Sequence, residues 1–89
     1  MSESSPKLFT LEQLGRLQEV PTSIDCECPN QLAIVLTNLG GFEDYSARCQ
    51  SADIADRDIH AMLYRETQKA RIIMEAALQK LIVHEKIEV

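Results

Sequence analysis

The fold is decided by residues 53–89, DIADRDIHAMLYRETQKARIIMEAALQKLIVHEKIEV, a stretch that contains neither proline nor glycine. Apolar side chains recur through it at three- and four-residue spacing, which is typical of one side of a helix. Asp53 can cap the first turn, and Asp56 and Asp58 suit the positive end of the helix dipole. A single long helix is therefore predicted from Asp53 onward. Its predicted buried stripe is Ile59, Leu63, Glu66, Ala70, Ile73, Ala77 and Leu81, widened by Met62, Met74 and Leu78.

A second long helix is predicted from about Pro29 to about Cys49. Proline is favoured at the first helical position, because its missing N–H would have no partner there. This placement puts Cys28 at the cap. One side of the helix repeats at helical spacing over several turns. Its members are Leu32, Val35, Leu36, Leu39, Phe42, Ser46 and Cys49.

Gly40 and Gly41 are the weak point of this second helix, because each glycine in a helix interior costs about 1 kcal/mol relative to alanine. Two interpretations are open. With Ala33 and Thr37 the glycines can form a narrow side where another backbone approaches closely. Alternatively, the helix kinks or breaks at this point.

A short first helix is predicted within residues 10–20, TLEQLGRLQEV. Thr10 and Gln13 have the spacing of a capping box, and Leu11, Leu14 and Leu17 recur on one side. The helix should end before Pro21, which disfavours helical geometry in the residue preceding it. Residues 1–9 are predicted to be a disordered tail, residues 10–84 a single helical domain, and residues 85–89 an extension of the last helix or a frayed tail.

The predicted fold is all-α: a short N-terminal helix followed by a long antiparallel helical hairpin, together forming a three-helix bundle. A short polar connection between two long helices favours the antiparallel arrangement. A chain of 89 residues has room for one domain. With 45% hydrophobic but only 4% aromatic residues, its core must be mainly aliphatic.

Composition limits which classes of partner and which cellular location are expected. A net charge of −5 opposes binding to a phosphate backbone, so no direct nucleic-acid binding is expected. There is no unbroken apolar run that could span a membrane and no secretory signal pattern. Three cysteines without such a signal fit reduced thiols, so a cytoplasmic location is expected.

The cysteines and histidines allow a metal, ligand or thiol-redox site, but only a weak one. Cys26 and Cys28 form the sole closely spaced pair, and an antiparallel last helix would return His84 toward them. A structural zinc site usually needs two such pairs. The competing interpretation is that these cysteines are small buried hydrophobic residues. No metal or other cofactor is therefore predicted.

A polar cluster is predicted where the two long helices would face each other. It consists of Glu43, Tyr45, His60 and Tyr64. Interhelical hydrogen bonds that fix the register are the favoured interpretation, and a ligand pocket is the alternative. The sequence offers no glycine-rich phosphate loop and no nucleophile with an oxyanion hole, so no catalytic residues and no enzymatic activity are predicted.

The runs VPTSIDCECPNQLAIVLTNLGGFEDYSARC (residues 20–49) and DIHAMLYRETQKAR (residues 58–71) resemble a helical C-terminal segment of some proteobacterial MerR-type transcription regulators. This resemblance implies an accessory or assembly domain of a regulator. It does not imply DNA binding, because the chain carries no winged helix-turn-helix. The matching positions are Cys26, Glu27, Cys28, Pro29, Phe42, Glu43, Tyr45, Ser46, Cys49 and His60.

The predicted function is a non-catalytic interaction or assembly module that forms a homodimer and can bind a protein partner. The alternative is a small sensor of a metal, a ligand or thiol redox state. The dimer is expected because the end of the last helix, LIVHEKIEV, is too apolar to stand alone in water. The predicted interface consists of Leu39, Gly40, Gly41, Leu81, Ile82 and Ile87.

Overall fold

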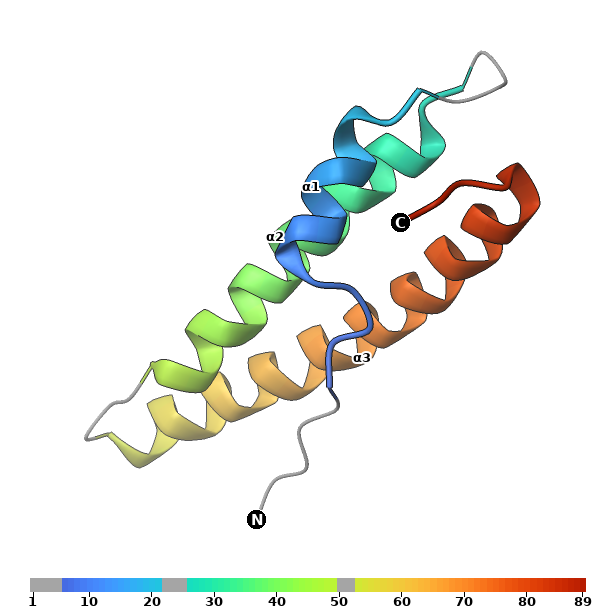
Figure 1. The fold of residues 1–89 in the computed structure, drawn as a ribbon. Coiled ribbons are helices and arrows are strands. Elements are labelled where there is room, and N and C mark those ends of the chain that lie inside the picture. Colours follow the sequence, from blue (N-terminus) through green and yellow to red (C-terminus); the bar gives the residue numbers. More distant parts are fainter. Residues whose placement is uncertain (1–5, 22–25, 50–52) are drawn as a thin grey trace.

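A computed structural model describes residues 6–21, 26–49 and 53–89, and it contains three helices: α1 (Leu11–Glu19), α2 (Cys28–Arg48) and α3 (Ile54–Glu85). None of the described residues forms a strand, so the all-α prediction is confirmed. In Figure 1, α1 lies against the first half of α2, and α3 returns alongside α2. The molecule is elongated, with extents of 51 × 19 × 18 Å. No helix in the described part is long and apolar enough to cross a membrane.

Both ends of α1 are capped by side chains. The Gln13 backbone N–H donates to Thr10 Oγ1 over 3.0 Å, and the Thr10 N–H donates to Gln13 Oε1 over 2.9 Å. This is the predicted capping box. At the other end, the side-chain amide of Asn30 donates to the carbonyl oxygens of Leu17 and Val20, each over 2.8 Å. Because these carbonyls have no partner within α1, a residue of α2 both caps α1 and fixes its position.

Helix α2 begins one residue earlier than predicted. Glu27 is the N-cap and Cys28 is the first helical residue, so the assignment of Cys28 as the cap is wrong. Pro29 lies in the first turn, as its lack of an N–H requires. The helix continues through Gly40 and Gly41, so the interpretation that it breaks there is wrong.

Helix α3 is capped by Asp53, whose Oδ1 accepts a hydrogen bond from the Ala55 N–H over 3.0 Å. The helix ends where Lys86 adopts a left-handed conformation with φ 56°. The Ile87 N–H then bonds back to the Ile82 carbonyl over 3.0 Å, and Ile87 packs against the core. This is a Schellman-type end with its hydrophobic contact. The chain therefore turns at Lys86, where an extended helix or a fraying tail was predicted.

The core combines residues from all three helices and from the N-terminal segment, residues 6–9. Phe9 is buried in it, although it belongs to the predicted disordered tail. Residues 6–9 therefore differ from that prediction, and residues 1–5 lie outside the described residues. The buried core residues are Phe9, Leu14, Leu17, Ala33, Leu36, Leu78 and Ile82, flanked by the partly buried Val20, Leu32, Leu39, Met74 and Ile87.

The buried side of α3 is not the predicted stripe. The described buried residues are Thr67, Arg71, Glu75, Leu78 and Ile82, of which only Leu78 belongs to the predicted stripe, and the others lie beside it on the helix surface. Ile59 and Ile73, both in the predicted stripe, are exposed. The prediction failed because it assigned burial mainly by hydrophobicity, whereas Arg71 and Glu75 of α3 are buried together with hydrogen-bonding partners.

Candidate functional site

A buried ion network lies between α2 and α3. Arg71 of α3 is 1% exposed, and its guanidinium lies between two carboxylates. Its Nε and Nη2 donate to Glu43 of α2, with Nη2 3.2 Å from Oε2. Its Nη1 donates to both carboxylate oxygens of Glu75, each at 3.0 Å. The network thus joins the two long helices by a two-point guanidinium–carboxylate contact.

Gln68 extends the network to one further predicted residue. Its Nε2 donates to Glu43 Oε2 over 2.9 Å and to Tyr64 Oη over 3.2 Å. Two of the four residues in the predicted polar cluster, Glu43 and Tyr64, are therefore brought together. Tyr45 instead lies exposed beside the ring of Phe42.

His60, the fourth predicted member, lies 3.7 Å from the carboxylate of Asp56 on its own helix. The sequence interpretation also missed the central residues of the cluster, Arg71, Glu75 and Gln68. A signal was present: Arg71 and Glu75 are four residues apart, and Arg71 lies seven residues before Leu78, two helical turns away on the same side.

The contacts of the network shift the pKa values of Glu43 and Arg71 toward their charged forms. Burial by itself would raise the pKa of Glu43, but hydrogen bonds from Arg71 and Gln68, together with the positive charges of Arg71 and Lys7, outweigh burial and lower that pKa. Burial would likewise lower the pKa of Arg71, whereas its bonds to Glu43 and Glu75 raise it. Both shifts favour the charged forms of Glu43 and Arg71, and the network forms a structural clamp whose groups are already engaged with one another.

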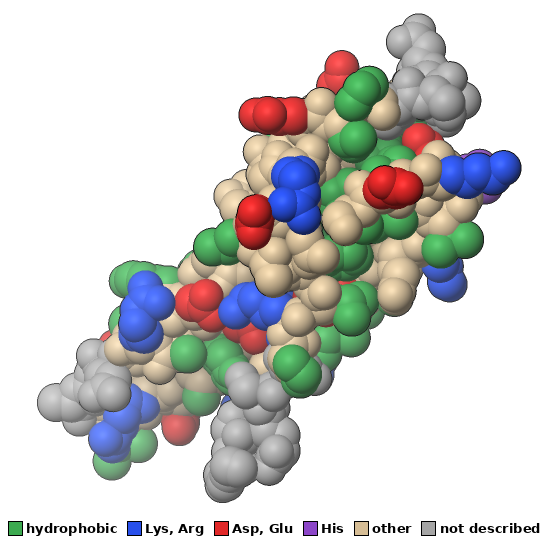
Figure 2. Space-filling model, in the orientation of Figure 1, with side chains coloured by type: hydrophobic (Ala, Val, Ile, Leu, Met, Phe, Trp, Pro, Cys, Tyr) green, Lys and Arg blue, Asp and Glu red, His purple; other side chains and the backbone are tan. Residues whose placement is uncertain are grey.

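The N-terminal segment is fastened to this clamp. The Leu8 N–H donates to Glu75 Oε2 over 2.9 Å, and Arg71 Nη1 donates to the Pro6 carbonyl over 3.4 Å. The Lys7 ammonium pairs with Asp44 of α2 at 2.7 Å. Figure 2 shows basic and acidic side chains side by side over the middle of the molecule. The segment consequently covers one flank of the α2–α3 pair.

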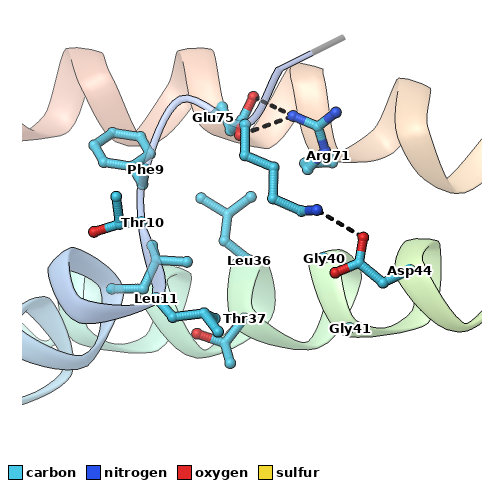
Figure 3. Close-up of a pocket in the computed structure, with 12 residues that line it drawn as sticks. Phe9, Thr10, Leu11, Leu36, Thr37, Gly40, Gly41, Asp44, Arg71 and Glu75 are labelled. Carbon is cyan, nitrogen blue, oxygen red and sulfur yellow. Dashed lines mark hydrogen bonds and ion pairs between the residues drawn. The ribbon is translucent and has the colours of Figure 1, made fainter. Parts of the chain in front are cut away.

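A cavity of about 550 Å³ lies where this segment crosses α2 (Figure 3). In Figure 3, Phe9 and Leu11 lie on one side of it, and Asp44 and the Arg71–Glu75 pair lie on the other. Lys7, which pairs with Asp44, also lines it. The complete lining is Lys7, Phe9, Thr10, Leu11, Leu14, Leu36, Thr37, Gly40, Gly41, Asp44, Arg71 and Glu75.

The opposite flank of the α2–α3 pair carries apolar side chains that stay partly exposed. Helix α1 and the N-terminal segment lie over Thr37, Gly40 and Asp44 of α2. Residues on the other side of the same helix, and their neighbours on α3, form what we call the open face. It consists of Val35, Leu39 and Phe42 of α2 and Ala70, Ile73, Ala77 and Leu81 of α3. Val35 and Phe42 are each 43% exposed, and Ile73 is 66% exposed.

The residues of the predicted interface are divided among different environments. Ile82 is buried in the core of its own chain, and Leu39 and Ile87 pack against that core. Gly40 lies beneath Lys7, whose Cε would be 3.3 Å from a Cβ built on that glycine.

The other two predicted interface residues, Leu81 and Gly41, remain accessible to different degrees: Leu81 is half-buried and Gly41 is exposed. Exposed apolar side chains lie both at the start of α3, at Ile54 and Ile59, and in the predicted overhang at its end, at Val83.

The candidate sensor residues do not form a metal centre in the described part of the chain. No group of three His, Cys, Asp or Glu side chains there is arranged to hold a metal ion. The Sγ atoms of Cys26 and Cys28 lie 2.9 Å apart without a disulfide between them, whereas His84 is exposed. The hydrogen bond with Cys26 is the main cause that raises the pKa of Cys28, followed by the Cys26 charge, burial and the charge of Glu85. A raised pKa lowers the fraction of reactive thiolate at neutral pH.

Comparison with known proteins identifies no relative: no family model, no curated protein and no solved structure matches this chain.

Proposed function

We propose that this protein is a non-catalytic helical module that self-associates into a homodimer through the open face. The observation that carries the proposal is the exposure of Val35 and Phe42 on one side of α2, together with the exposed Ile73 at the outer edge of α3. Apolar side chains clustered on a surface usually mark an interface rather than a solvated face. Here the cluster includes part of the apolar stripe that the sequence of each helix presents.

The shape of this face favours a second copy of the chain as its partner. We take α2 and α3 as an antiparallel hairpin, so that the open face is a pair of neighbouring helix surfaces. A two-fold rotation would lay that face against its own copy, with each protomer contributing the same residues. The product is a four-helix bundle, a stable way to bury two such faces. The small side chains of Ala70 and Ala77 would let the helices of the two protomers approach each other closely.

The buried network supports a structural role for the polar residues. Glu43, Arg71 and Glu75 bond to one another and fasten the N-terminal segment, an arrangement that fixes which residues of α2 and α3 face each other. The further proposal, that the dimer is an accessory module of transcription regulation, rests on the resemblance to MerR-type regulators alone. Full-length relatives with an attached DNA-binding domain would test that part separately.

Sedimentation equilibrium tests the dimer. The expected result is a species of twice the 10.0 kDa chain mass at high micromolar concentration. Ile73→Glu should convert it to monomer, because a charge would be buried in an apolar interface. Val83→Glu is the matched control, since Val83 is 73% exposed on the same helix but outside the open face. A monomeric wild-type protein, or an Ile73→Glu variant that dimerises like the control, would reject the proposal.

One observation favours a second candidate function, a thiol-redox module. The Sγ atoms of Cys26 and Cys28 lie 2.9 Å apart, close enough for a disulfide to form with little movement. The raised pKa of Cys28 opposes rapid reaction, so we place this function second. Thiol titration of purified protein, before and after exposure to oxidised glutathione, distinguishes the two. Loss of two titratable thiols without intermolecular crosslinking would support the redox function.

A further inference from the structure

The cavity beneath the N-terminal segment suggests a binding activity that the dimer does not require. We propose that this cavity binds an uncharged, mainly apolar small molecule. Its volume of about 550 Å³ falls within the range of small-molecule sites, and its walls are formed largely by Phe9, Leu11, Leu14 and Leu36. It lies on the flank opposite the open face, so that ligand binding and self-association would use separate surfaces.

Gly41 lies at the cavity and leaves room for a side chain that could be introduced there. A Cβ on Gly41 would have no atom within 4 Å outside its local backbone, whereas one on Gly40 would meet the Lys7 side chain. A side chain at position 40 would therefore press against Lys7, whereas one at the exposed position 41 would have open space. A glycine at this position still weakens the helix by about 1 kcal/mol relative to alanine. The space that it leaves belongs to the cavity, which a larger side chain would fill.

The charges around the cavity determine the ligand class. Lys7 is paired with Asp44, and Arg71 is paired with Glu75, so these four lining groups sum to zero charge. Glu43 lies behind Arg71 and adds a negative charge. An anion would therefore find no uncompensated cation and would lose its hydration on entry. An uncharged ligand avoids this cost, and the Lys7 ammonium, with three N–H donors, can hydrogen-bond to an acceptor on it.

Two fluorescent probes that share one ring system test both the site and its charge preference. N-phenyl-naphthylamine is uncharged, and anilinonaphthalene sulfonate adds a single negative charge to the same rings. Both emit more strongly in apolar surroundings, so each can be titrated with the full chain. We expect the uncharged probe to bind at least about tenfold more tightly, because only the sulfonate must be desolvated without a free cation.

Gly41→Leu places a side chain in the cavity and should weaken binding of the uncharged probe by at least about tenfold, since the ligand would lose its space. The variant should fold, because leucine is a far better helix former than glycine. Circular dichroism during thermal unfolding checks this. Gly41→Ala is the matched control, which raises helix propensity equally but fills little of the cavity. Leu11→Glu offers a second, fold-tolerant change at the cavity wall, since Leu11 is exposed in the first turn of α1.

Ile73→Glu separates cavity binding from dye adsorbed on the open face, and it should leave binding of the uncharged probe unchanged. The proposal would be overturned by any of three results: no binding of that probe to the wild-type chain, equal binding by Gly41→Leu and Gly41→Ala, or loss of binding in Ile73→Glu alone. If Gly41→Leu fails to fold, unchanged binding in Leu11→Glu overturns it instead. Sedimentation of the same variants reports on the dimer independently, so the two proposals can fail separately.

Discussion

The two halves of the contact between α2 and α3 are held together by different physics. In one half, Ala33 and Leu36 of α2 pack with Leu78 and Ile82 of α3 in an apolar core. In the other half, Glu43 of α2 meets Arg71 of α3 through a guanidinium–carboxylate contact. Both regions are buried, but one buries hydrocarbon and the other buries charge.

This difference determines what each half can specify. Apolar contacts are non-directional, and their free energy follows the area removed from water, so several registers of the two helices could give similar burial. A buried guanidinium needs carboxylate oxygens at fixed positions, and a shifted register would leave it without them. The apolar half therefore supplies stability, and the ion network selects one alignment and fastens residues 6–9 to it.

Arg71→Ala should produce the largest loss of stability. It leaves the buried carboxylates of Glu43 and Glu75 without their cation, and breaking such a buried arrangement costs about 3–5 kcal/mol. Urea unfolding followed by circular dichroism measures the change. Replacing Glu43, Arg71 and Glu75 together by Met, Met and Leu is the informative comparison, because no charge then remains buried. If the triple variant loses as much unfolding free energy as Arg71→Ala, the unpaired buried charges are not the main cause of that loss.

Leu78→Ala tests the apolar half, where a loss of about 3 kcal/mol is expected from the removed transfer energy and the cavity left behind. Leu78 is fully buried in the centre of the core, so the site has little room to relax. Val83→Ala on the same helix is the control and should change the unfolding free energy by less than about 0.5 kcal/mol. Equal effects of the two substitutions would contradict the assigned core.

Acidification should lower the free energy of unfolding through the polar half of the contact. We expect this loss to be smaller than those caused by Arg71→Ala and Leu78→Ala. The pKa of Glu43 is lower in the folded chain than in the unfolded one, so its contribution to stability is complete above the unfolded value, about 4.3. That contribution is lost as the pH falls through the folded pKa. Urea unfolding between neutral and acidic pH should therefore show a steeper acid loss for wild type than for Glu43→Gln. If the stability of the two proteins falls in parallel with pH, Glu43 does not contribute to the acid-induced loss.

The sequence was most informative where local chemistry determines structure. The capping box at Thr10, the cap at Asp53 and the stop before Pro21 all depend on groups within a few residues of each other, and each is found as predicted. The uninterrupted run after Asp53 likewise predicted a single long helix. Its buried side was predicted incorrectly, because Arg71 and Glu75 count as solvent-facing residues until a carboxylate from another helix is placed beside them.

By itself, then, the sequence determined an all-α protein with three helices and the caps that start two of them, because backbone geometry and hydrophobic spacing act over a few residues. The tertiary structure decided which side of each long helix is buried, that residues 6–9 belong to the fold, and that Gly41 borders empty space. These features depend on pairings between residues far apart in the chain, such as Glu43 with Arg71 and Leu8 with Glu75. Local propensity carries no information about such pairings, since the free energy of a buried charge depends on the partner that folding brings to it.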